Sequence, residues 1–560
     1  MFKKLSVSIL IGVLILLVVV GCGNQQSQPQ NQPQEQEEQQ EQQTKTYSEE
    51  EKVGGTFYGR LGSNPPDLDP AHATDTTSSR VVRNVFDGLV KYNKKLEVEP
   101  AIAKSWESSQ DGTEWTFKLR KGVKFHNGNE VKASDVVYSF SRLLDPETQS
   151  ERAWLFENVV GAKAFQDGET DKVKGLKAVD DYTVKISLKE PFAPFLSMLC
   201  MGNASIVPQE AIEKMGNQFG QNPVGTGPFE FESWKQDSKL VLTKHEDYYE
   251  DNRPYLDKVV YRIIVEGTSA FPEYEQGNIY EFDADIPDGQ MERVMDSEGE
   301  FANEYRQIDR LGTYYLAINN EKEPFNNKKV RKAMNYAVNK EIIAKVVRNG
   351  TVNPADGILP PGMPGYNEDL KGYSYNQEKA KQLLKEAGYE DGLPGKYKII
   401  YNTSKKHQRN LEAIQRNLQQ VGIDVQLVNM DWGTVLDRAD QGDFTLMRMG
   451  WIADYPDPDN FLHVLFHSKN AGAGGNYAFY KNEEIDKKLE KARRMERGKE
   501  RLALYQEIEQ QIMNDAPWVP IYYYSTPVLV QPFVHNYVFT GQTPLPLTNV
   551  WVEPGHKTRE

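Results

Sequence analysis

One stretch in the second half of the chain sets the class of fold. Apolar residues recur there at the spacing of one helix face: Leu411, Ile414, Leu418 and Val421. The pattern stops at Gly422, and residues 423–428 then alternate apolar and polar side chains as a strand does. A helix that ends at a glycine and leads directly into a strand is typical of a mixed α/β domain.

Similar patterns elsewhere support this fold class. Apolar spacing predicts a helix over 134–144 and apolar helix faces over 330–338 and 380–387, the last stopping at Gly388. Residues 115–119 alternate apolar and polar side chains, and 123–125 resume the alternation after a Lys-Gly turn, which predicts a hairpin. We expect the apolar faces of the predicted helices to be core.

The N-terminus has the pattern of an export signal. Two lysines precede an apolar run, Ile9–Val20, which is followed by Gly21 and Cys22. The run is too short for a spanning helix, which needs about 20 apolar residues. Residues 1–21 therefore read as a signal peptide ending in a lipobox, with Cys22 lipid-modified as the mature N-terminus. The alternative is a plain signal peptide with an incidental cysteine.

A polar segment follows. Residues 24–50 consist almost entirely of Gln, Glu, Pro, Ser, Asn and Thr, a composition that buries too little apolar surface to fold. We expect 22–52 to be a disordered, lipid-anchored tether with a reach of about 30 Å. The folded part would then lie at the outer face of the cell membrane.

Composition argues against several classes of protein. The net charge of -15 over 560 residues argues against nucleic acid as a partner. There are two cysteines, and lipidation of Cys22 would leave Cys200 unpaired, so we expect no disulfide framework and a buried, inert Cys200 thiol.

Motifs of catalysis and cofactor binding are missing from the sequence. It contains no His-Glu-x-x-His, no Gly-x-Ser-x-Gly and no Gly-x-x-x-x-Gly-Lys, and Gly225–Pro228 reads as a structural turn. Asp454, Asp457 and Asp459 lack the glycine and closing glutamate of a calcium loop. We expect a protein without enzymatic activity, metal or cofactor. An anchored hydrolase using paired carboxylates is an alternative.

Four blocks together resemble one family, the extracellular solute-binding proteins of peptide-uptake ABC transporters, which bind oligopeptides and dipeptides. They are Trp115–His126, Asn222–Phe229, Pro324–Ala333 and Gly450–Leu462, in the order of the family. The resemblance covers nearly all of the chain after the tether.

The resemblance implies an α/β, two-lobed fold like that of type II periplasmic binding proteins, with an additional small domain and a ligand cleft between the lobes. The first lobe would be discontinuous and comprise 53–88, 211–310 and 523–560. The small domain would span 89–210, and 311–522 would form the opposing lobe. A monomer would capture a peptide by hinge closure and deliver it to an ABC permease in the membrane.

The resemblance also implies a peptide site. In the family's Trp-x-x-Asp motif the aspartate holds the α-ammonium of the peptide, and Trp451 and Asp454 occupy these positions. The alternative for Asp454 is a solvated or helix-capping role. Thr74, Asp75 and Thr76 match the edge that pairs with the peptide backbone through main-chain groups.

Three further positions follow from the resemblance. Arg448 and Arg348 match cations offered to the peptide carboxylate, although either could be an ordinary surface or interlobe charge. Trp432 matches a pocket-lining tryptophan, with a core role as the alternative.

The sequence departs from the well-studied oligopeptide binders at one pair of positions. Those proteins commonly carry a cysteine pair near the hinge, where this chain has Gly312 and Ile452. Other members of this structural family bind nickel chelates, haem, glutathione or short oligosaccharides, so the solute stays open, as does peptide length. A lipoprotein that presents or folds partners at the surface is a further alternative.

Overall fold

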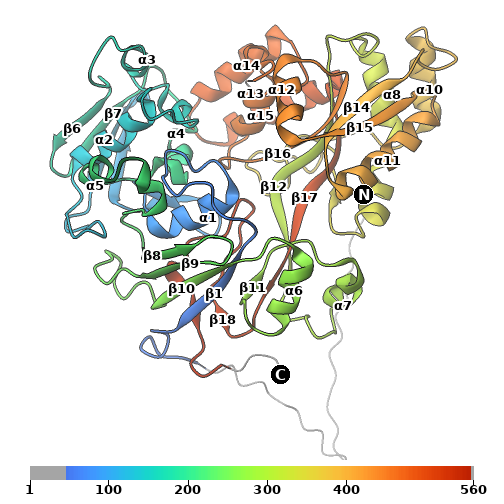
Figure 1. Cartoon of the computed structure of the whole chain (residues 1–560). Coiled ribbons are helices and arrows are strands. Elements are labelled where there is room, and N and C mark those ends of the chain that lie inside the picture. Colours follow the sequence, from blue (N-terminus) through green and yellow to red (C-terminus); the bar gives the residue numbers. More distant parts are fainter. Residues whose placement is uncertain (1–45, 474, 557–560) are drawn as a thin grey trace, which may run out of the picture. The chain divides into compact units, whose positions relative to one another are not determined.

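The helices expected from apolar spacing are present in the computed structural model, which describes residues 46–473 and 475–556 (Figure 1). They are α2 (Ala133–Leu144), α8 (Lys328–Ala337), α10 (Gln377–Glu386) and α11 (Lys405–Gln419). Asn327, Asn376 and Ser404 cap the last three by accepting a backbone N–H of the first turn. The predicted signal peptide, Cys22 and most of the predicted tether lie outside the described residues.

A four-stranded sheet contains the first strand of the described residues. Its order is β1 (Thr56–Leu61), β10 (Lys258–Ile263), β9 (Lys239–Lys244) and β8 (Phe229–Lys235). The β1–β10 pair is parallel and the other pairs are antiparallel. Its core also takes side chains from α1 (Thr76–Val85), from α5 (Gln209–Met215) and from the pair β18 (Val534–His535) and β19 (Trp551–Val552). Segments far apart in the sequence thus share one core.

A second, antiparallel sheet has the order β4 (Ala103–Ser108), β5 (Glu114–Leu119), β7 (Thr183–Ser187) and β6 (Leu176–Asp180). A short pair, β2 (Val90–Tyr92) and β3 (Val98–Pro100), lies beside it with α2, α3 (Ala162–Gln166) and α4 (Phe195–Met198). Cys200 is buried in this core, as expected, and burial raises the pKa of its thiol.

The hairpin prediction was wrong in its pairing. Strand β5 pairs with β4 and β7, whereas Lys124 makes only an isolated bridge with Glu130. Both partners of β5 present longer alternating edges than residues 123–125 offer, so the turn at Gly122 leads away from β5 instead of folding back on it.

The third sheet is the largest, with seven strands. Its order is β11 (Glu281–Phe282), β17 (Trp518–Val530), β12 (Tyr305–Ile318), β16 (Leu446–Ile452), β14 (Tyr397–Asn402) and β15 (Val425–Met430), and β13 (Asn353–Pro354) also pairs with β17. The α11–β15 connection contains the glycine stop predicted from the sequence, since Gly422 has φ +84°.

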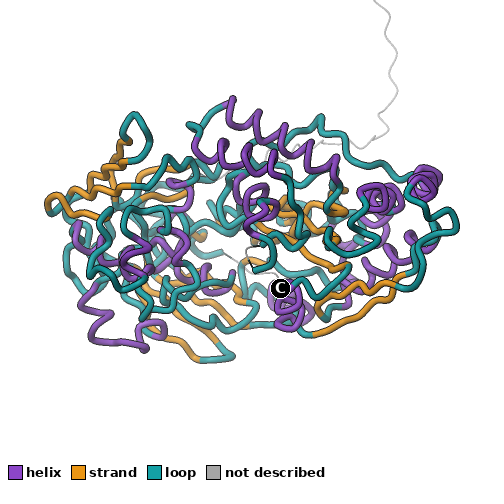
Figure 2. The backbone as a smooth tube through the Cα atoms, turned by 90° about the horizontal axis from the view of Figure 1, so that it is seen from above, coloured by secondary structure: helices purple, strands orange, loops and turns teal. Residues whose placement is uncertain are grey.

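Helices cover both faces of this sheet. Alternate residues of β12 enter different cores: Tyr314, Leu316 and Ile318 pack with α8, α10 and α11, whereas Tyr315 and Ala317 pack with the C-terminal helices. Those helices are α12 (Trp432–Gln441), α13 (Asp459–Phe466), α14 (Glu483–Arg494) and α15 (Lys499–Asp515). Seen from above, helices and strands alternate across the right-hand part of the molecule (Figure 2).

Two long strands of this sheet, β12 and β17, run side by side, and at their far end β17 pairs with β11, where α6 (Gly267–Glu275) and α7 (Met291–Met295) pack (Figure 1). Their register shifts between the Asp309–Ser525 and Thr313–Tyr523 pairs, which marks a bulge. Next to it, Gly312 of β12 is paired with Ile452 of β16. No helix within the described residues combines the length and apolar character needed to cross a membrane.

Candidate ligand-binding site

Trp451 and Asp454 line one cavity, of about 660 Å³. Two regions far apart in the sequence form its walls, residues 152–198 and residues 451–493. The first region belongs to the core of the second sheet and the other to the third sheet, so the cavity lies where two separately built cores meet.

Asn460 fixes both of the predicted residues. Strand β16 ends at Ile452, a loop follows, and α13 places Asn460 beneath that loop. The Oδ1 atom of Asn460 accepts the indole N–H of Trp451 at 2.9 Å and the backbone N–H of Asp454 at 3.0 Å, and its amide donates to Asp454 Oδ2 at 3.3 Å. Asn460 is buried, so these bonds hold the Trp-x-x-Asp segment in one conformation. The motif itself contains no signal for this partner.

The neighbouring aspartates have other partners. Asp457 accepts two hydrogen bonds from Arg501, at 2.7 and 2.8 Å, and Asp459 accepts one from Tyr455 at 2.9 Å. Three carboxylates close in sequence therefore point to separate groups. Among the described residues, no cluster of three His, Cys, Asp or Glu side chains could hold a metal ion.

The carboxylate of Asp454 makes only part of the hydrogen bonds that it can accept. Its side chain is 28% exposed, and burial raises the pKa of its carboxyl, while Arg152 and Asn460 act in the opposite direction. Nη1 of Arg152 lies 3.8 Å from Asp454 Oδ1, beyond hydrogen-bonding distance. Nη2 of the same arginine donates to the carbonyl oxygen of Thr74 at 3.0 Å. Thr74 and Asp454 therefore lie on either side of one guanidinium group.

The segment from Thr74 to Thr76 leads into a helix. Asp75 caps α1 by accepting the backbone N–H groups of Thr77 and Ser78 at 2.8 and 2.9 Å, so its carboxylate is already engaged. Thr76 lines a second cavity, of about 230 Å³, together with Arg310. Gln542, which also lines it, donates to the carbonyl oxygens of Ala453 and Asp454. The two cavities are therefore neighbours at Asp454.

Arg448 is a buried cation without a carboxylate partner among the described residues. It lies on β16, its Nη1 donates to Asn402 and its Nη2 to the Tyr524 hydroxyl at 3.0 Å, and its guanidinium stacks 4.6 Å from the Tyr314 ring. Its Nε has no partner. A buried charge with unused donors is costly unless a ligand supplies the counter-charge.

Arg348 lines a third cavity, of about 340 Å³, with Lys406 and Asp285. Lys406 lies 3.2 Å from Asp285, whereas Arg348 has no ion pair among the described residues. Burial, followed by the charges of Arg448, Lys406 and Arg348, lowers the pKa of His407 to about 3. His407 is therefore neutral near pH 7, and we call the three charged residues, Arg348, Lys406 and Arg448, the cationic group. The sequence identified the two arginines of this group but not Lys406 or the neighbouring His407, which follow the Ser404 cap of α11.

The family model for bacterial extracellular solute-binding proteins, family 5 (middle region), matches residues 97–473. The chain belongs to the family 5 extracellular solute-binding proteins. The periplasmic oligopeptide-binding protein OppA of Salmonella typhimurium is 33% identical over 508 residues, covering 88% of this chain and 90% of that protein. Heme-binding protein A of Haemophilus influenzae is 34% identical over 511 residues, covering 86% and 90%.

The fold agrees with solved structures of similar proteins. The periplasmic binding protein DppA of Helicobacter pylori, in complex with the peptide STSA, is 34% identical with a TM-score of 0.76, covering 90% of this chain and 99% of that one. The expected α/β class of periplasmic binding proteins is thus confirmed. This family 5 protein has no disulfide at Gly312 and Ile452, although these positions are direct register partners.

Trp432 lies apart from the other predicted residues of this family 5 protein. It is the first residue of α12 and 45% exposed, which excludes a core role. It lines none of the three cavities described above.

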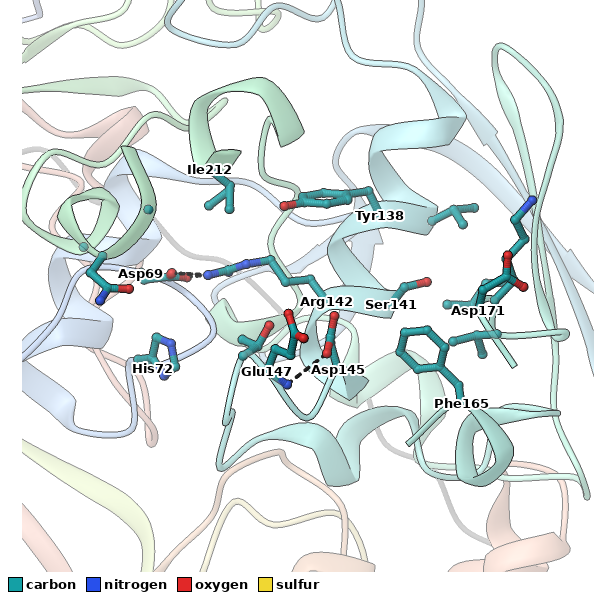
Figure 3. A pocket seen from close by; sticks show the side chains of 18 of the residues that line it. Asp69, His72, Tyr138, Ser141, Arg142, Asp145, Glu147, Phe165, Asp171 and Ile212 are labelled. Carbon is teal, nitrogen blue, oxygen red and sulfur yellow. Dashed lines mark hydrogen bonds and ion pairs between the residues drawn. The ribbon is translucent and has the colours of Figure 1, made fainter. Parts of the chain in front are cut away.

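One further cavity of this family 5 protein contains none of the predicted residues. Its volume is about 700 Å³, and a hydrogen-bonded ion pair of Asp69 and Arg142 lies in its wall (Figure 3). Asp69 accepts two hydrogen bonds from Arg142, at 2.5 and 2.9 Å, and Asp145 accepts the backbone N–H of Glu147. We call it the paired cavity, and the one at Asp454 the Asp454 cavity.

Proposed function

We propose that this protein is the membrane-anchored binding subunit of an ABC importer that captures oligopeptides outside the cell. The observation that carries the proposal is the open carboxylate of Asp454. Asn460 orients it and it lines a cavity, but its Oδ1 has no hydrogen-bond donor among the described residues. A peptide α-ammonium supplies such a donor together with the matching charge.

The rest of the peptide would extend away from Asp454. Backbone groups of Thr74–Thr76 would pair with its main chain, which gives affinity independent of sequence. The cationic group would take the carboxylate, because Arg448 and Arg348 have no ion pair of their own among the described residues. Trp451 would pack against the first residue, and Trp432 would line a pocket for a later side chain.

We infer that the two lobes close over the peptide. We assign the first lobe to 53–88, 211–310 and 523–560, the small domain to 89–210, and the opposing lobe to 311–522. Strands β12 and β17 cross the proposed boundaries at 310 and 523, and their bulge between Asp309 and Thr313 lies at the same place. A bulge there allows the two strands to bend as a hinge, so that closure buries the peptide.

Anchoring would confine capture to the membrane surface. Cys22 would carry the lipid, and residues 22–52 would tether a monomeric receptor beside its permease, which raises its local concentration there. The permease and its ATPase subunits would supply the transport step, and this chain would perform no catalysis.

A different solute is the second candidate. Heme-binding protein A matches the chain as well as the oligopeptide binder does, so haem competes with peptides as the ligand, as do a dipeptide, glutathione, a nickel chelate and an oligosaccharide. The oriented carboxylate of Asp454 favours a ligand with an ammonium group.

Native mass spectrometry of the full chain, purified without added ligand, tests the proposal. We expect co-purified peptides, whose masses would also give their length. Calorimetry then tests the carboxylate end: amidation of a peptide should weaken binding to wild type about tenfold, and Arg448→Gln should reduce that difference. A co-purified haem or sugar, or equal affinity for the amidated and free peptides, would contradict the proposal or this part of it.

A further inference from the structure

Arg152 is placed to contact the same ligand end as Asp454. It precedes a short 3-10 helix, Ala153–Phe156, and reaches both the Thr74 carbonyl and the vicinity of the Asp454 carboxylate. Its side chain is 19% exposed and lines the Asp454 cavity. An ordinary salt bridge would join the two residues through a hydrogen bond, and the 3.8 Å separation leaves that bond unmade.

Both members of the pair keep unused hydrogen-bonding capacity. On Arg152, Nη2 is engaged by Thr74, whereas Nε is buried without a partner and Nη1 faces Asp454 from beyond bonding distance. On Asp454, Oδ2 is engaged by Asn460 and Oδ1 has no donor among the described residues. The site therefore offers an acceptor and a donor of opposite charge side by side.

Two other cations line the Asp454 cavity. Lys189 donates to the carbonyl oxygen of Glu157 at 2.8 Å, and Nε of Arg493 lies 3.0 Å from Asp459, so both are placed next to other groups. Among the described residues, Arg152 is the cation that lies within 4 Å of the Asp454 carboxylate, and a ligand group that enters beside Asp454 meets it there.

This arrangement discriminates between ligand ends. An ammonium bound to Asp454 without a neighbouring carboxylate lies close to the Arg152 guanidinium, and the like charges repel each other in a partly buried site. A carboxylate on the same ligand residue removes the repulsion and takes the free N–H groups of Arg152.

We propose that Arg152 and Asp454 form a paired site that prefers a terminal ligand residue bearing both an ammonium and a carboxylate. This inference rests on the proposed function, because it assigns the ammonium to Asp454. Two kinds of ligand carry that chemistry: a peptide whose first residue is Glu or Asp, and a γ-glutamyl peptide, in which both groups are on the α-carbon.

Calorimetric titration of the full chain with Glu-Ala-Ala, Gln-Ala-Ala and γ-Glu-Ala-Ala tests the proposal. We expect wild type to bind at least one of the two acidic ligands about tenfold more tightly than Gln-Ala-Ala. Arg152→Gln should abolish that preference, because it weakens binding of the acidic ligands and removes the repulsion that Gln-Ala-Ala meets, and Arg152→Lys should retain part of the preference. Arg306→Gln, at an exposed position outside the cavity, is the matched control and should behave as wild type.

Each remaining outcome decides a different point. The tighter of the two acidic ligands identifies the source of the carboxylate. Equal affinity of wild type for all three ligands would overturn this inference and leave the proposed function intact. An equal loss of affinity for all three in Arg152→Gln would overturn it as well, since it would mean that Arg152 only supports Thr74. Binding of none by wild type would overturn both the inference and the proposed function.

Discussion

The paired cavity and the Asp454 cavity have nearly the same volume, about 700 and 660 Å³, and each contains an arginine beside an aspartate. In the paired cavity Arg142 donates two hydrogen bonds to Asp69, which also accepts the backbone N–H of Ala71. In the Asp454 cavity Arg152 lies 3.8 Å from Asp454, and both side chains keep unused hydrogen-bonding capacity.

Unmet hydrogen-bonding capacity, and not volume, distinguishes the proposed ligand site from the paired cavity. A satisfied buried ion pair contributes to folding and has nothing left to offer a ligand. An unsatisfied pair lowers stability, and it persists where a ligand completes it.

The largest expected effect is on stability. Asp69→Ala removes the carboxylate from the nearly buried Arg142 and should lower the free energy of unfolding by about 3 to 5 kcal/mol. Asp454→Ala, in a more exposed and unbonded pair, should lower it by about 1 kcal/mol or less. Urea unfolding of both variants and wild type measures this. A larger loss for Asp454→Ala than for Asp69→Ala would invert the comparison.

Asn460 gives the next effect, on affinity. Asn460→Ala leaves the Trp451 indole and the Asp454 backbone N–H without their acceptor and frees the Asp454 carboxylate to rotate. We expect peptide affinity to fall about thirtyfold, about 2 kcal/mol, by calorimetry. The matched control is Asn217→Ala, an exposed residue of the paired cavity, which should leave affinity unchanged. If both variants bound as wild type does, orientation of Asp454 by Asn460 would be irrelevant to binding.

Acidification should give the smallest of these changes, a gradual fall in peptide affinity with pH. Burial raises the pKa of Asp454 above its ordinary value, and a ligand ammonium pairs with the ionised carboxyl. Lowering the pH through this pKa protonates Asp454, so affinity should fall, by about tenfold per unit once the pH is below it. Asp454→Asn should bind weakly and lack this dependence over the same range. Parallel pH profiles for the two proteins would contradict the role of Asp454.

The sequence was a good guide to local structure. The faces of α2, α8, α10 and α11 follow from apolar spacing, because a helix pattern repeats within a few residues. The pairing of β5 did not follow, since alternation in Trp115–Leu119 identifies a strand without naming its partner, and β7 lies more than 60 residues away.

The residues of the candidate site also fall into those that a local pattern identifies and those that depend on long-range contacts. Trp451 and Asp454 were found through resemblance to a family motif, which is a local pattern. Arg152 was not found, because its place beside Asp454 depends on contact between two cores about 300 residues apart in the chain. The prediction for Trp432 is still untested, and its exposed position gives no contact from which to argue.

The most direct test of the account compares Ala-Ala-Ala with its N-acetylated form on wild type and on Asp454→Ala, by calorimetry of the full chain. We expect acetylation, which removes the ammonium, to weaken wild-type binding by about a hundredfold, about 3 kcal/mol. Asp454→Ala should bind both forms with the same low affinity, while the exposed control Asp437→Ala should match wild type. If Asp454→Ala bound the free tripeptide as tightly as wild type, the assignment of Asp454 to the ligand ammonium would be wrong.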